Sequence, residues 1–593
     1  MRKHWLIAAG AAALLVGASA SGPSRSTEAS LNILREIVFQ DLCGPNAGAA
    51  MRRSLEAMIA SANAYAQTLP QDANAPPPLL NGLGDAHFAI TTASPDAQAY
   101  FDQGVRYLHA FNHAEAVRSF RHAQQLDPQC GMCFWGEAFA LGPNINAPME
   151  EGDFAPAFAA MQAAHARRDG VTPLEHALID AMQARYVENG GPDRAALDAA
   201  FADAMNGVAD AFPDNNLAQV LAAEAAMDTQ PWDYWEANGR DPKGRIGAAL
   251  GRIETVLARS PNDSGAIHLY IHLVEASADP WRSEQAAERL AGAAPQAGHL
   301  VHMPAHIYYR IGRFRDSIRA NIDAVATDEA YIRAANPSPI YQFGYYPHNV
   351  HFVLTSAAMG GDGRTALDYA ERLDEAVPME MAQAVVLAQP VKAAPWFARA
   401  QFATPRSVLD ASPPPEGVSY VTGAWRYARA IAHLRSGDAS AARGEIAALD
   451  QLIADGDFTA MNAAAIPAEH ILQTYSTLLN GRVLMAEGDY PAAIAELRRA
   501  VEMQAEIPYM EPPYIYYPLR RTLGAAYLRA GQPALAEQEF LQTLIESPND
   551  AYAYWGLQQA RRARGNRIGA NAARLLFNAA FLGRRNSMSV EHL

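Results

Sequence analysis

The sequence predicts an all-α protein, a solenoid in which antiparallel helix pairs stack into a superhelix. At 593 residues the chain is too long for one hydrophobic core, so several domains or a repeat array are expected. Alanine is abundant, and the basic residues are nearly all arginine, with lysine only at Lys3, Lys243 and Lys392. This composition favours helix over a large sheet. A pattern with a period of 34 residues at both ends of the chain favours the repeat array over separate domains.

The first clear repeat lies between Tyr100 and Pro128. Small residues, aromatic residues and a final proline fall at fixed spacings within it, namely Gly104, Tyr107, Ala116, Phe120, Ala123 and Pro128. We expect the small residues to let two helices approach closely, the aromatic residue to fill the gap between them, and the proline to end the second helix. These spacings resemble the tetratricopeptide repeat (TPR), which implies a TPR-type α-solenoid.

The same frame recurs near the C-terminus and is weaker in the middle of the chain. The C-terminal units contain Gly481, Gly488, Tyr490, Ala493, Ala500, Gly524, Tyr527, Gly531, Ala536, Phe540 and Pro548. In the middle, Pro213 and Pro261 are expected to close second helices, and two insertions near 230–242 and 331–346 are expected to form loops. We expect an N-terminal helical cap and Pro-rich linker over 21–90, and about eight to ten helical pairs over 91–593, with histidine-rich central repeats at 264–360.

The N-terminus has the pattern of a secretory signal peptide over residues 1–20. A basic start is followed by an apolar run from Leu6 to Val16 and by small residues at Ala18 and Ala20. The run is shorter than the about 20 residues that span a bilayer, and no later segment is long enough, so an uncleaved anchor is the lesser alternative. We therefore expect a periplasmic or secreted protein with no membrane span after cleavage of the signal.

The formal net charge of −16 argues against nucleic acid as a partner, because binding phosphates needs a basic stripe. A small molecule or a peptide in the concave groove of the solenoid is the expected ligand. No phosphate loop, dinucleotide fingerprint, Gly-x-Ser-x-Gly elbow or His-Glu-x-x-His motif occurs, so nucleotide cofactors, serine hydrolases and zinc proteases lack support.

The three cysteines permit one disulfide and one thiol in an oxidising compartment. A structural bridge from Cys43 to either Cys130 or Cys133 is the favoured arrangement, although the sequence leaves the pairing open. A thioredoxin-like pair would need a βαβ context, which is missing. Haem attachment would need a histidine after Cys133, where Phe134 stands.

Histidines cluster in the central repeats. Seven of the 17 lie within 84 residues, where an even spread would put about two or three. The first two are four residues apart and share one face of a predicted helix, with Glu275 one turn further along. The positions 34 residues after His268 and His272 are again histidines, His302 and His306. The last pair, His348 and His351, repeats the three-residue spacing of His299 and His302. The pattern therefore recurs on three helices, through His268, His272, His299, His302, His306, His348 and His351.

We interpret these seven histidines as a metal site. In the frame of the repeats they fall on the first helix of each pair, at positions that line the concave groove in TPR proteins. Neighbouring helices lie about 8–10 Å apart, so imidazoles from three of them can converge. Imidazole suits zinc, copper, iron or nickel, whereas calcium and magnesium need more oxygen ligands. Seven ligands exceed the needs of one tetrahedral zinc, which predicts two or three ions or some indirect ligands.

A single pair of histidines four residues apart would be read as an ordinary helix surface. The main alternative for the whole cluster is a groove that binds an anionic peptide or small acid through histidines with Arg310 and Arg313. If the site is catalytic, Glu275, Tyr270 and Tyr308 are the candidate proton donors or acceptors. Glu224 and Asp228 are expected on a solvated helix face rather than in the groove. The aromatic insertion Trp232–Trp235 is expected to serve packing rather than to wall off the site.

The chain also resembles a group of exported bacterial TPR proteins, largely uncharacterised, in segments 111–116, 127–136 and 141–146 and in the histidine segments from His268 and His299. The resemblance implies the solenoid and supplies no established reaction. The leading hypothesis is an exported metal-binding TPR protein that acts as a copper-dependent, or other transition-metal, oxidoreductase, with copper favoured over zinc or iron. The alternative is a non-catalytic scaffold that binds a peptide or protein partner in its groove.

Overall fold

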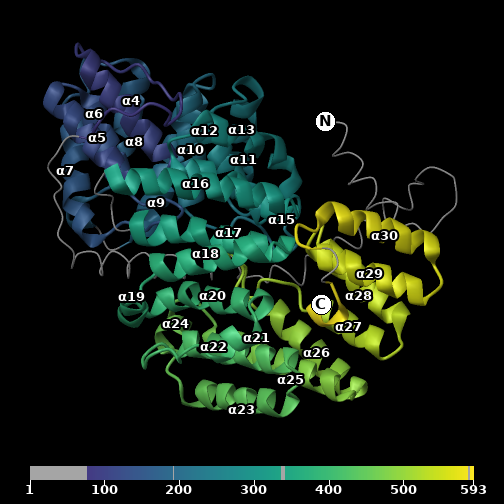
Figure 1. The fold of residues 1–593 in the computed structure, drawn as a ribbon. Coiled ribbons are helices and arrows are strands. Elements are labelled where there is room, and N and C mark those ends of the chain that lie inside the picture. Colours follow the sequence, from purple (N-terminus) through teal and green to yellow (C-terminus); the bar gives the residue numbers. More distant parts are fainter. Residues whose placement is uncertain (1–76, 191–192, 335–340, 585–587) are drawn as a thin grey trace. The chain divides into compact units, whose positions relative to one another are not determined.

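The computed structural model describes residues 77–593 except 191–192, 335–340 and 585–587, and over these ranges the chain is all-α (Figure 1). Two isolated β-bridges, Asn144 with Ala147 and Trp235 with Pro242, are the sole extended pairings among the described residues. The predicted fold class is confirmed. The predicted signal peptide, Cys43 and most of the N-terminal cap lie outside the described residues.

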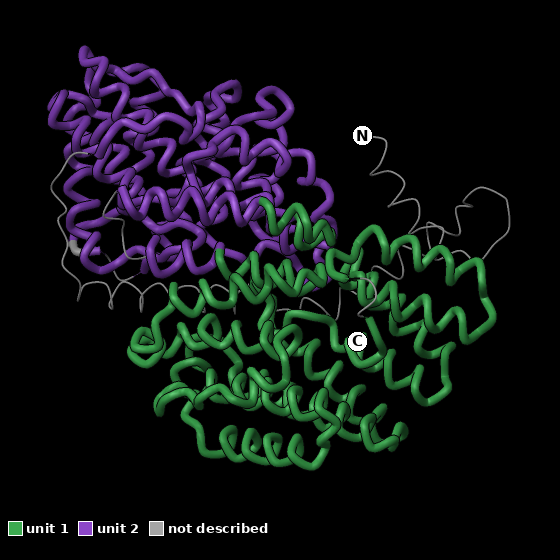
Figure 2. Tube along the Cα trace, in the orientation of Figure 1, with its two compact units in different colours: residues 1–44, 308–319, 350–593 green, residues 45–307, 320–349 purple. Residues whose placement is uncertain are grey.

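The chain divides into two compact units, which Figure 2 draws in different colours. One consists of residues 45–307 and 320–349, and we call it the histidine unit because it contains the first six histidines of the cluster. The other consists of residues 1–44, 308–319 and 350–593, and we call it the C-terminal unit. Each unit is described by itself.

The histidine unit is a series of helices in which each packs against its neighbours in sequence. Short connections between successive helices make neighbours antiparallel. In chain order the helices are α4 (Pro95–His109), α5 (His113–Leu126), α6 (Gly131–Ala140), α7 (Phe154–His165), α8 (Pro173–Met182), α9 (Arg194–Ala211), α10 (Asn216–Asp228), α11 (Ile246–Arg259), α12 (Ser264–Glu275), α13 (Glu284–Ala293) and α14 (Gly298–His302), followed by parts of α15 (Pro304–Arg310), α16 (Phe314–Ala334) and α17 (Tyr346–Gly360).

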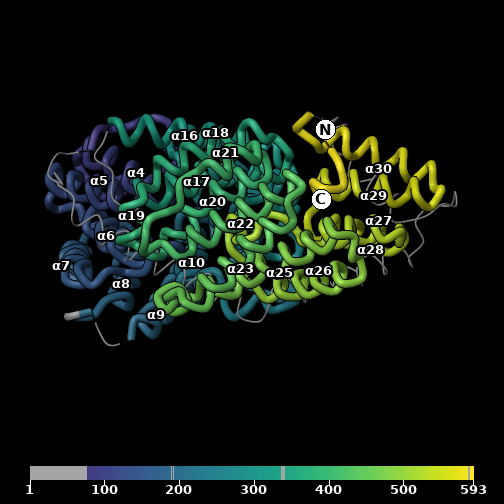
Figure 3. The backbone as a smooth tube through the Cα atoms, turned by 60° about the horizontal axis from the view of Figure 1, so that its bottom comes forward, coloured from purple at the N-terminus to yellow at the C-terminus, as the bar shows by residue number. Residues whose placement is uncertain are grey.

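The C-terminal unit continues the same arrangement. Figures 1 and 3 both show its helices stacked side by side, and neighbours such as α22 and α23 or α25 and α26 pack against each other. After α17 the helices are α18 (Gly363–Ala376), α19 (Met379–Ala384), α20 (Gln389–Phe402), α21 (Pro405–Leu409), α22 (Ser419–Arg435), α23 (Ala439–Asp455), α24 (Thr459–Ala463), α25 (Ala468–Glu487), α26 (Tyr490–Ala505), α27 (Arg520–Arg529), α28 (Pro533–Glu546), α29 (Ala551–Ala563) and α30 (Arg567–Ala580).

The small residues of the repeat frame act as predicted. The ring of Phe120, on α5, lies between Gly104 of α4 and Gly136 of α6, and a Cβ at either glycine would fall 2.4–2.5 Å from that ring. Phe540 has the same place between Gly524 and Gly556 in the last repeat. Both phenylalanines are fully buried. Only glycine leaves room for the aromatic ring that joins three successive helices, which is why this spacing marks the repeat.

Cys130 and Cys133 form a disulfide with each other, with their Cα atoms 5.4 Å apart. This corrects the expectation that one of them bridges Cys43. Cys130 precedes α6 and Cys133 lies in its first turn, so the pair is brought together by the start of one helix. Over the described residues, no helix combines the length and the apolar composition that crossing a bilayer requires.

Candidate metal centre

Helix α12 presents three polar side chains toward the interior of the histidine unit. The helix starts after Asp263, whose carboxylate accepts a hydrogen bond from the backbone N–H of Ala266. His268, His272 and Glu275 then follow at helical spacing, and none of them is more than 1 % exposed. The predicted common face is confirmed, although it faces the interior and not an open groove.

The next three histidines come from two short helices rather than the single helix that the sequence predicts. Pro304 has no N–H to continue the helical ladder, so α14 ends at His302 and α15 begins at Pro304. His299 and His302 belong to α14, and His306 belongs to α15. All three are buried, with at most 3 % of each residue exposed.

Helix α17 supplies the sixth histidine of the cluster, half-buried His348. A π-helical turn, η4 (Tyr341–Tyr345), leads directly into this helix. The seventh predicted ligand, His351, belongs to the C-terminal unit, where its Nε2 lies 2.7 Å from the hydroxyl of Tyr516. His351 is therefore hydrogen-bonded to a tyrosine and is not part of either histidine group described next.

The first group, triad 1, consists of His268, His272 and His299. The Nε2 atom of His268 lies 3.0 Å from that of His272 and 3.1 Å from that of His299. All three potential ligand atoms lie within 4.8 Å of one another. Three ring nitrogens from two helices therefore converge on one point.

The second group, triad 2, consists of His302, His306 and His348. The Nε2 atom of His302 lies 2.7 Å from that of His306 and 3.2 Å from that of His348. These three atoms also lie within 4.8 Å of one another. Triad 2 thus repeats the arrangement of triad 1, as the 34-residue offset between the two histidine pairs predicts.

The two triads adjoin each other. The ring centres of His272 and His306 are 6.0 Å apart, and those of His299 and His302 are 6.1 Å apart. Glu275 links the triads, because one carboxylate oxygen lies 2.7 Å from Nδ1 of His272 and the other lies 2.6 Å from Nδ1 of His306. One buried carboxylate therefore contacts a ring in each triad and is hydrogen-bonded to His272.

Hydrogen bonds on the outer side of the rings fix which nitrogen carries the proton. Nδ1 of His268 lies 2.7 Å from the backbone oxygen of His109, and Nδ1 of His302 lies 2.5 Å from Oδ1 of Asn321. Carbonyl and carboxylate oxygens only accept, so Nδ1 must donate in these two rings and in His272, which is hydrogen-bonded to Glu275. In three of the six rings, those of His268, His272 and His302, Nε2 consequently carries a lone pair directed toward the triad.

The electrostatic surroundings favour the neutral form of three of the rings. Burial lowers the pKa of His268, His299 and His302 well below the usual range of histidine, and the neighbouring imidazoles lower it further. If one imidazole were protonated, its positive charge would repel a second protonated imidazole nearby. Neutral imidazole is the form that binds a metal ion.

Two aromatic residues with unusual backbone conformations cover triad 1. The ring of Phe111 lies with its centre 4.4 Å from that of His268, and it is nearly parallel to the ring of His272. Trp232 meets His272 edge to face at 5.0 Å. Phe111 has φ +52° and Trp232 has φ +65°, a left-handed conformation that bulky side chains rarely adopt. Such strain is concentrated at functional sites. Phe111 was not among the expected site residues and Trp232 was expected to serve packing, because repeat periodicity carries no signal for either backbone conformation.

The remaining predicted residues lie elsewhere. The hydroxyl of Tyr270 donates to Glu254, and the ring of Tyr308 lies under the guanidinium of Arg313. Tyr270 therefore turns toward the preceding helix α11, which leaves Glu275 as the candidate proton acceptor in contact with histidines.

The positions of Glu224 and Asp228 differ from the prediction. Glu224 and Asp228 were expected on a solvated helix face, but both are buried, and Asp228 pairs with the buried Arg185 at 3.2 Å. Burial raises the pKa of Glu224 to about 7. The Asp228 carboxylate thus balances an internal arginine.

No protein-family model matches the chain, and no curated protein matches it. Among solved structures it is similar to a human IFIT1 dimer with m7Gppp-AAAA (11 % identity, 93 % of this chain and 98 % of that chain, TM-score 0.30). It is also similar to the P58(IPK) TPR domain (12 % identity, 79 % of this chain and 98 % of that chain, TM-score 0.22). A third similar structure is the Cut9–Hcn1 hetero-tetramer of APC/C (13 % identity, 84 % of this chain and 89 % of that chain, TM-score 0.21). At these TM-scores the description of the site rests on the chain's own geometry.

Proposed function

We propose that the two triads hold two transition-metal ions, one each, and that the chain is an exported metal-dependent oxidoreductase. One observation carries the proposal. In triad 1 the two closest Nε2 atoms, those of His268 and His272, are 3.0 Å apart, and both carry lone pairs because their Nδ1 atoms donate outward. Two lone pairs at this distance repel unless a cation lies between them and binds both.

The spacing of the nitrogens fits a metal ion. A metal–imidazole bond of about 2.0–2.1 Å implies ligand nitrogens about 2.9 Å apart at right angles and about 3.3 Å apart in a tetrahedron. The neighbouring Nε2 atoms are 2.7–3.2 Å apart in the two triads. Three protein ligands per ion also leave a coordination position open for a substrate, as catalytic sites do.

The donor set favours copper. All six donors are imidazoles, which suit copper, zinc, iron and nickel, and copper(II) binds such donors most tightly among the divalent ions. An exported, oxidising location, expected from the signal peptide, agrees with copper. Copper at such a centre would supply one-electron chemistry with dioxygen as the acceptor.

The chain's own residues have distinct roles in this proposal. Glu275 contacts His272 and His306 and links the two ions' ligands through one carboxylate. Phe111 and Trp232 keep water from one side of triad 1. The open coordination positions would take a small molecule, because an extended peptide cannot reach side chains that are this deeply buried.

A non-catalytic scaffold remains the second candidate function, and one feature favours it. Helix α30 carries two exposed apolar side chains, Ile568 and Leu575, seven residues apart and so on one face. Helical repeats commonly bind a partner helix through such a face. This function would need no metal.

Metal content distinguishes the two functions. Elemental analysis of the exported chain should give two transition-metal ions per chain. The double variant H302A/H306A should retain one, and H268A/H272A should also retain one. His351→Ala is the matched control, because this buried histidine bonds to Tyr516, and it should keep both ions. Substoichiometric metal in the parent would refute the metalloprotein and leave the scaffold.

The oxidoreductase part of the proposal needs its own test. Dioxygen uptake in the presence of ascorbate should occur with the copper-loaded chain and not with the zinc-loaded chain, since zinc has no redox chemistry. Equal uptake by the copper-loaded chain and by free copper at the same concentration would refute an oxidoreductase while leaving metal binding intact.

A further inference from the structure

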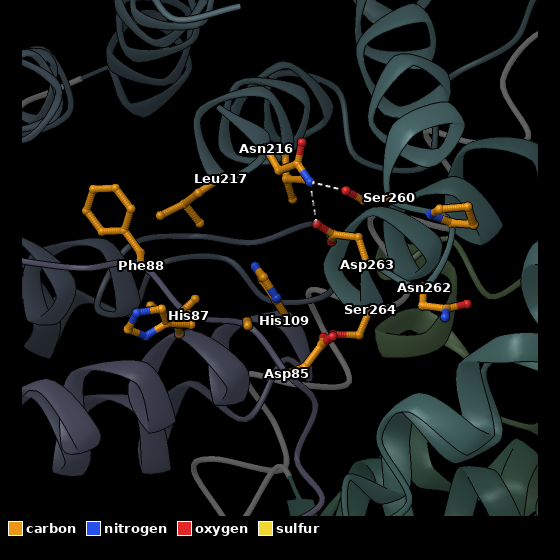
Figure 4. A pocket seen from close by; sticks show the side chains of 14 residues that line it. Asp85, His87, Phe88, His109, Asn216, Leu217, Ser260, Asn262, Asp263 and Ser264 are labelled. Atoms are coloured by element: carbon orange, nitrogen blue, oxygen red, sulfur yellow. Dashed lines mark hydrogen bonds between the residues drawn. The ribbon is translucent and has the colours of Figure 1, made fainter. Parts of the chain in front are cut away.

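A cavity separate from the two triads lies in the histidine unit where α4, α10 and the start of α12 meet. It has a volume of about 380 Å³, which is within the range of small-molecule sites. Figure 4 shows His109 in the middle of its lining, between Asp85 and the pair formed by Asn216 and Asp263.

His109 is a buried polar side chain that lacks hydrogen-bond partners. Only 8 % of it is exposed, yet neither ring nitrogen has a hydrogen-bond partner among the described residues. Its ring packs against Gly265, where a Cβ would lie 2.7 Å from two ring atoms, so the imidazole is held in one position. A buried polar group without a partner costs about 1–3 kcal/mol, and a ligand that hydrogen-bonds to the ring would remove this cost.

The charges around the cavity indicate the sign of the ligand. Two carboxylates line it, Asp85 and Asp263, and none of the lining residues is lysine or arginine. His87, at the rim, is paired with Asp102 at 2.7 Å and adds no free positive group. A ligand here meets a negative field and an imidazole, and a cation with N–H donors complements both.

Apolar side chains complete the lining. Phe88, Val105, Leu217 and Val220 face the same cavity and give the ligand's body a surface to bury. The carboxylates and these apolar groups together fit an amphipathic amine. A bare metal ion fits less well. The ligand atoms of each triad lie within 4.8 Å of one another, whereas those of Asp85, Asp263 and His109 do not.

We propose that this cavity binds a small organic ammonium compound with an apolar body, whose N–H groups donate to His109 and whose charge is balanced by Asp85 and Asp263. The site does not depend on metal in the triads. It does adjoin them, because the backbone oxygen of His109 is the one that accepts from Nδ1 of His268. A bound amine would therefore contact the residue that orients one of the proposed metal ligands.

The test is isothermal titration calorimetry of the metal-free full chain with three probes of similar shape. 2-Phenylethylammonium should bind with a Kd below about 1 mM, at one site per chain. The neutral 2-phenylethanol should bind at least about fivefold more weakly, because it lacks the charge that the carboxylates balance. The anion 3-phenylpropanoate should give no heat. Equal binding of alcohol and ammonium, or no binding of the ammonium at 10-fold this concentration, overturns the proposal.

Substitutions of single aspartates distinguish binding in this cavity from a general effect of the chain's negative charge on ammonium affinity. Asp85 is exposed, so D85N leaves the fold intact, and it should weaken the ammonium about fivefold. D263N should do the same while keeping the cap of α12, because asparagine caps a helix as well as aspartate does. Asp203, an exposed carboxylate outside the cavity, provides the control D203N, which should bind as the parent does. Unchanged affinity in both D85N and D263N would overturn the proposal.

Discussion

Replacing Glu275 tests how far one carboxylate organises both triads. Its two oxygens lie 2.7 Å and 2.6 Å from the Nδ1 atoms of His272 and His306, one ring in each triad. In Glu275→Gln, the amide oxygen can still accept from His272, but the NH₂ group then replaces the carboxylate oxygen beside Nδ1 of His306. In Glu275→Ala both rings lose their partner. The two variants should therefore affect one and two metal ions, respectively.

The size of the effect follows from the loss of an outer hydrogen bond to a metal ligand, which lowers metal affinity about 10–100-fold, or about 1.4–2.7 kcal/mol. E275Q should weaken one of two stepwise metal affinities by this factor and leave the other within about twofold of the parent. E275A should weaken both. The assay is a titration of the metal-free chain with copper(II) against a competing chelator, fitted to two stepwise dissociation constants.

Glu224→Gln is the control, because Glu224 is also buried in the histidine unit but interacts with Arg185. It should leave both affinities unchanged. The reasoning is refuted if E275A binds both ions as tightly as the parent does, or if E224Q weakens them equally.

Three further predictions concern the repeats, a buried carboxyl group and the cover of triad 1. Gly104→Ala should lower the free energy of unfolding by about 1–3 kcal/mol in urea denaturation, because its Cβ would fall 2.5 Å from the Phe120 ring. Gly207→Ala, with no neighbour within 4 Å, should raise it by up to about 1 kcal/mol, and equal effects of the two would contradict the packing argument. Burial raises the pKa of Asp328 to about 7, so the folded chain keeps a proton on this carboxyl group that the unfolded chain releases. The free energy of unfolding should therefore fall by up to about 4 kcal/mol from pH 4 to pH 7, relative to that of the Asp328→Asn variant. Parallel pH profiles of the parent and the variant would contradict this prediction. Phe111→Ala should leave two metal ions bound but speed the removal of one by a chelator, whereas an unchanged rate would show that the ring does not shield triad 1.

The fold was predictable because its determinants are local and periodic. Gly104 and Phe120 recur at the same spacing as Gly524 and Phe540, and each glycine marks a place where only a missing Cβ allows the ring to fit. The disulfide was not predictable from pairing rules alone. Cys130 and Cys133 meet because a helix starts between them.

The histidine cluster was predictable in part, for the same reason. The four-residue spacing of His268 and His272, repeated 34 residues later, placed both pairs on facing helices. The break at Pro304 could also have been foreseen, since proline ends a helix. The Tyr516 partner of His351 lies 165 residues away, and no local pattern encodes such a contact. The strained backbones of Phe111 and Trp232 are likewise set by tertiary packing.

X-ray absorption spectroscopy of the metal-loaded chain tests the central claim most directly. The account predicts two ions per chain, each with three imidazole nitrogens at about 2.0 Å. A first shell dominated by oxygen or sulfur, or a fully loaded sample with fewer than three imidazole nitrogens per ion, would contradict two triads that each hold one ion.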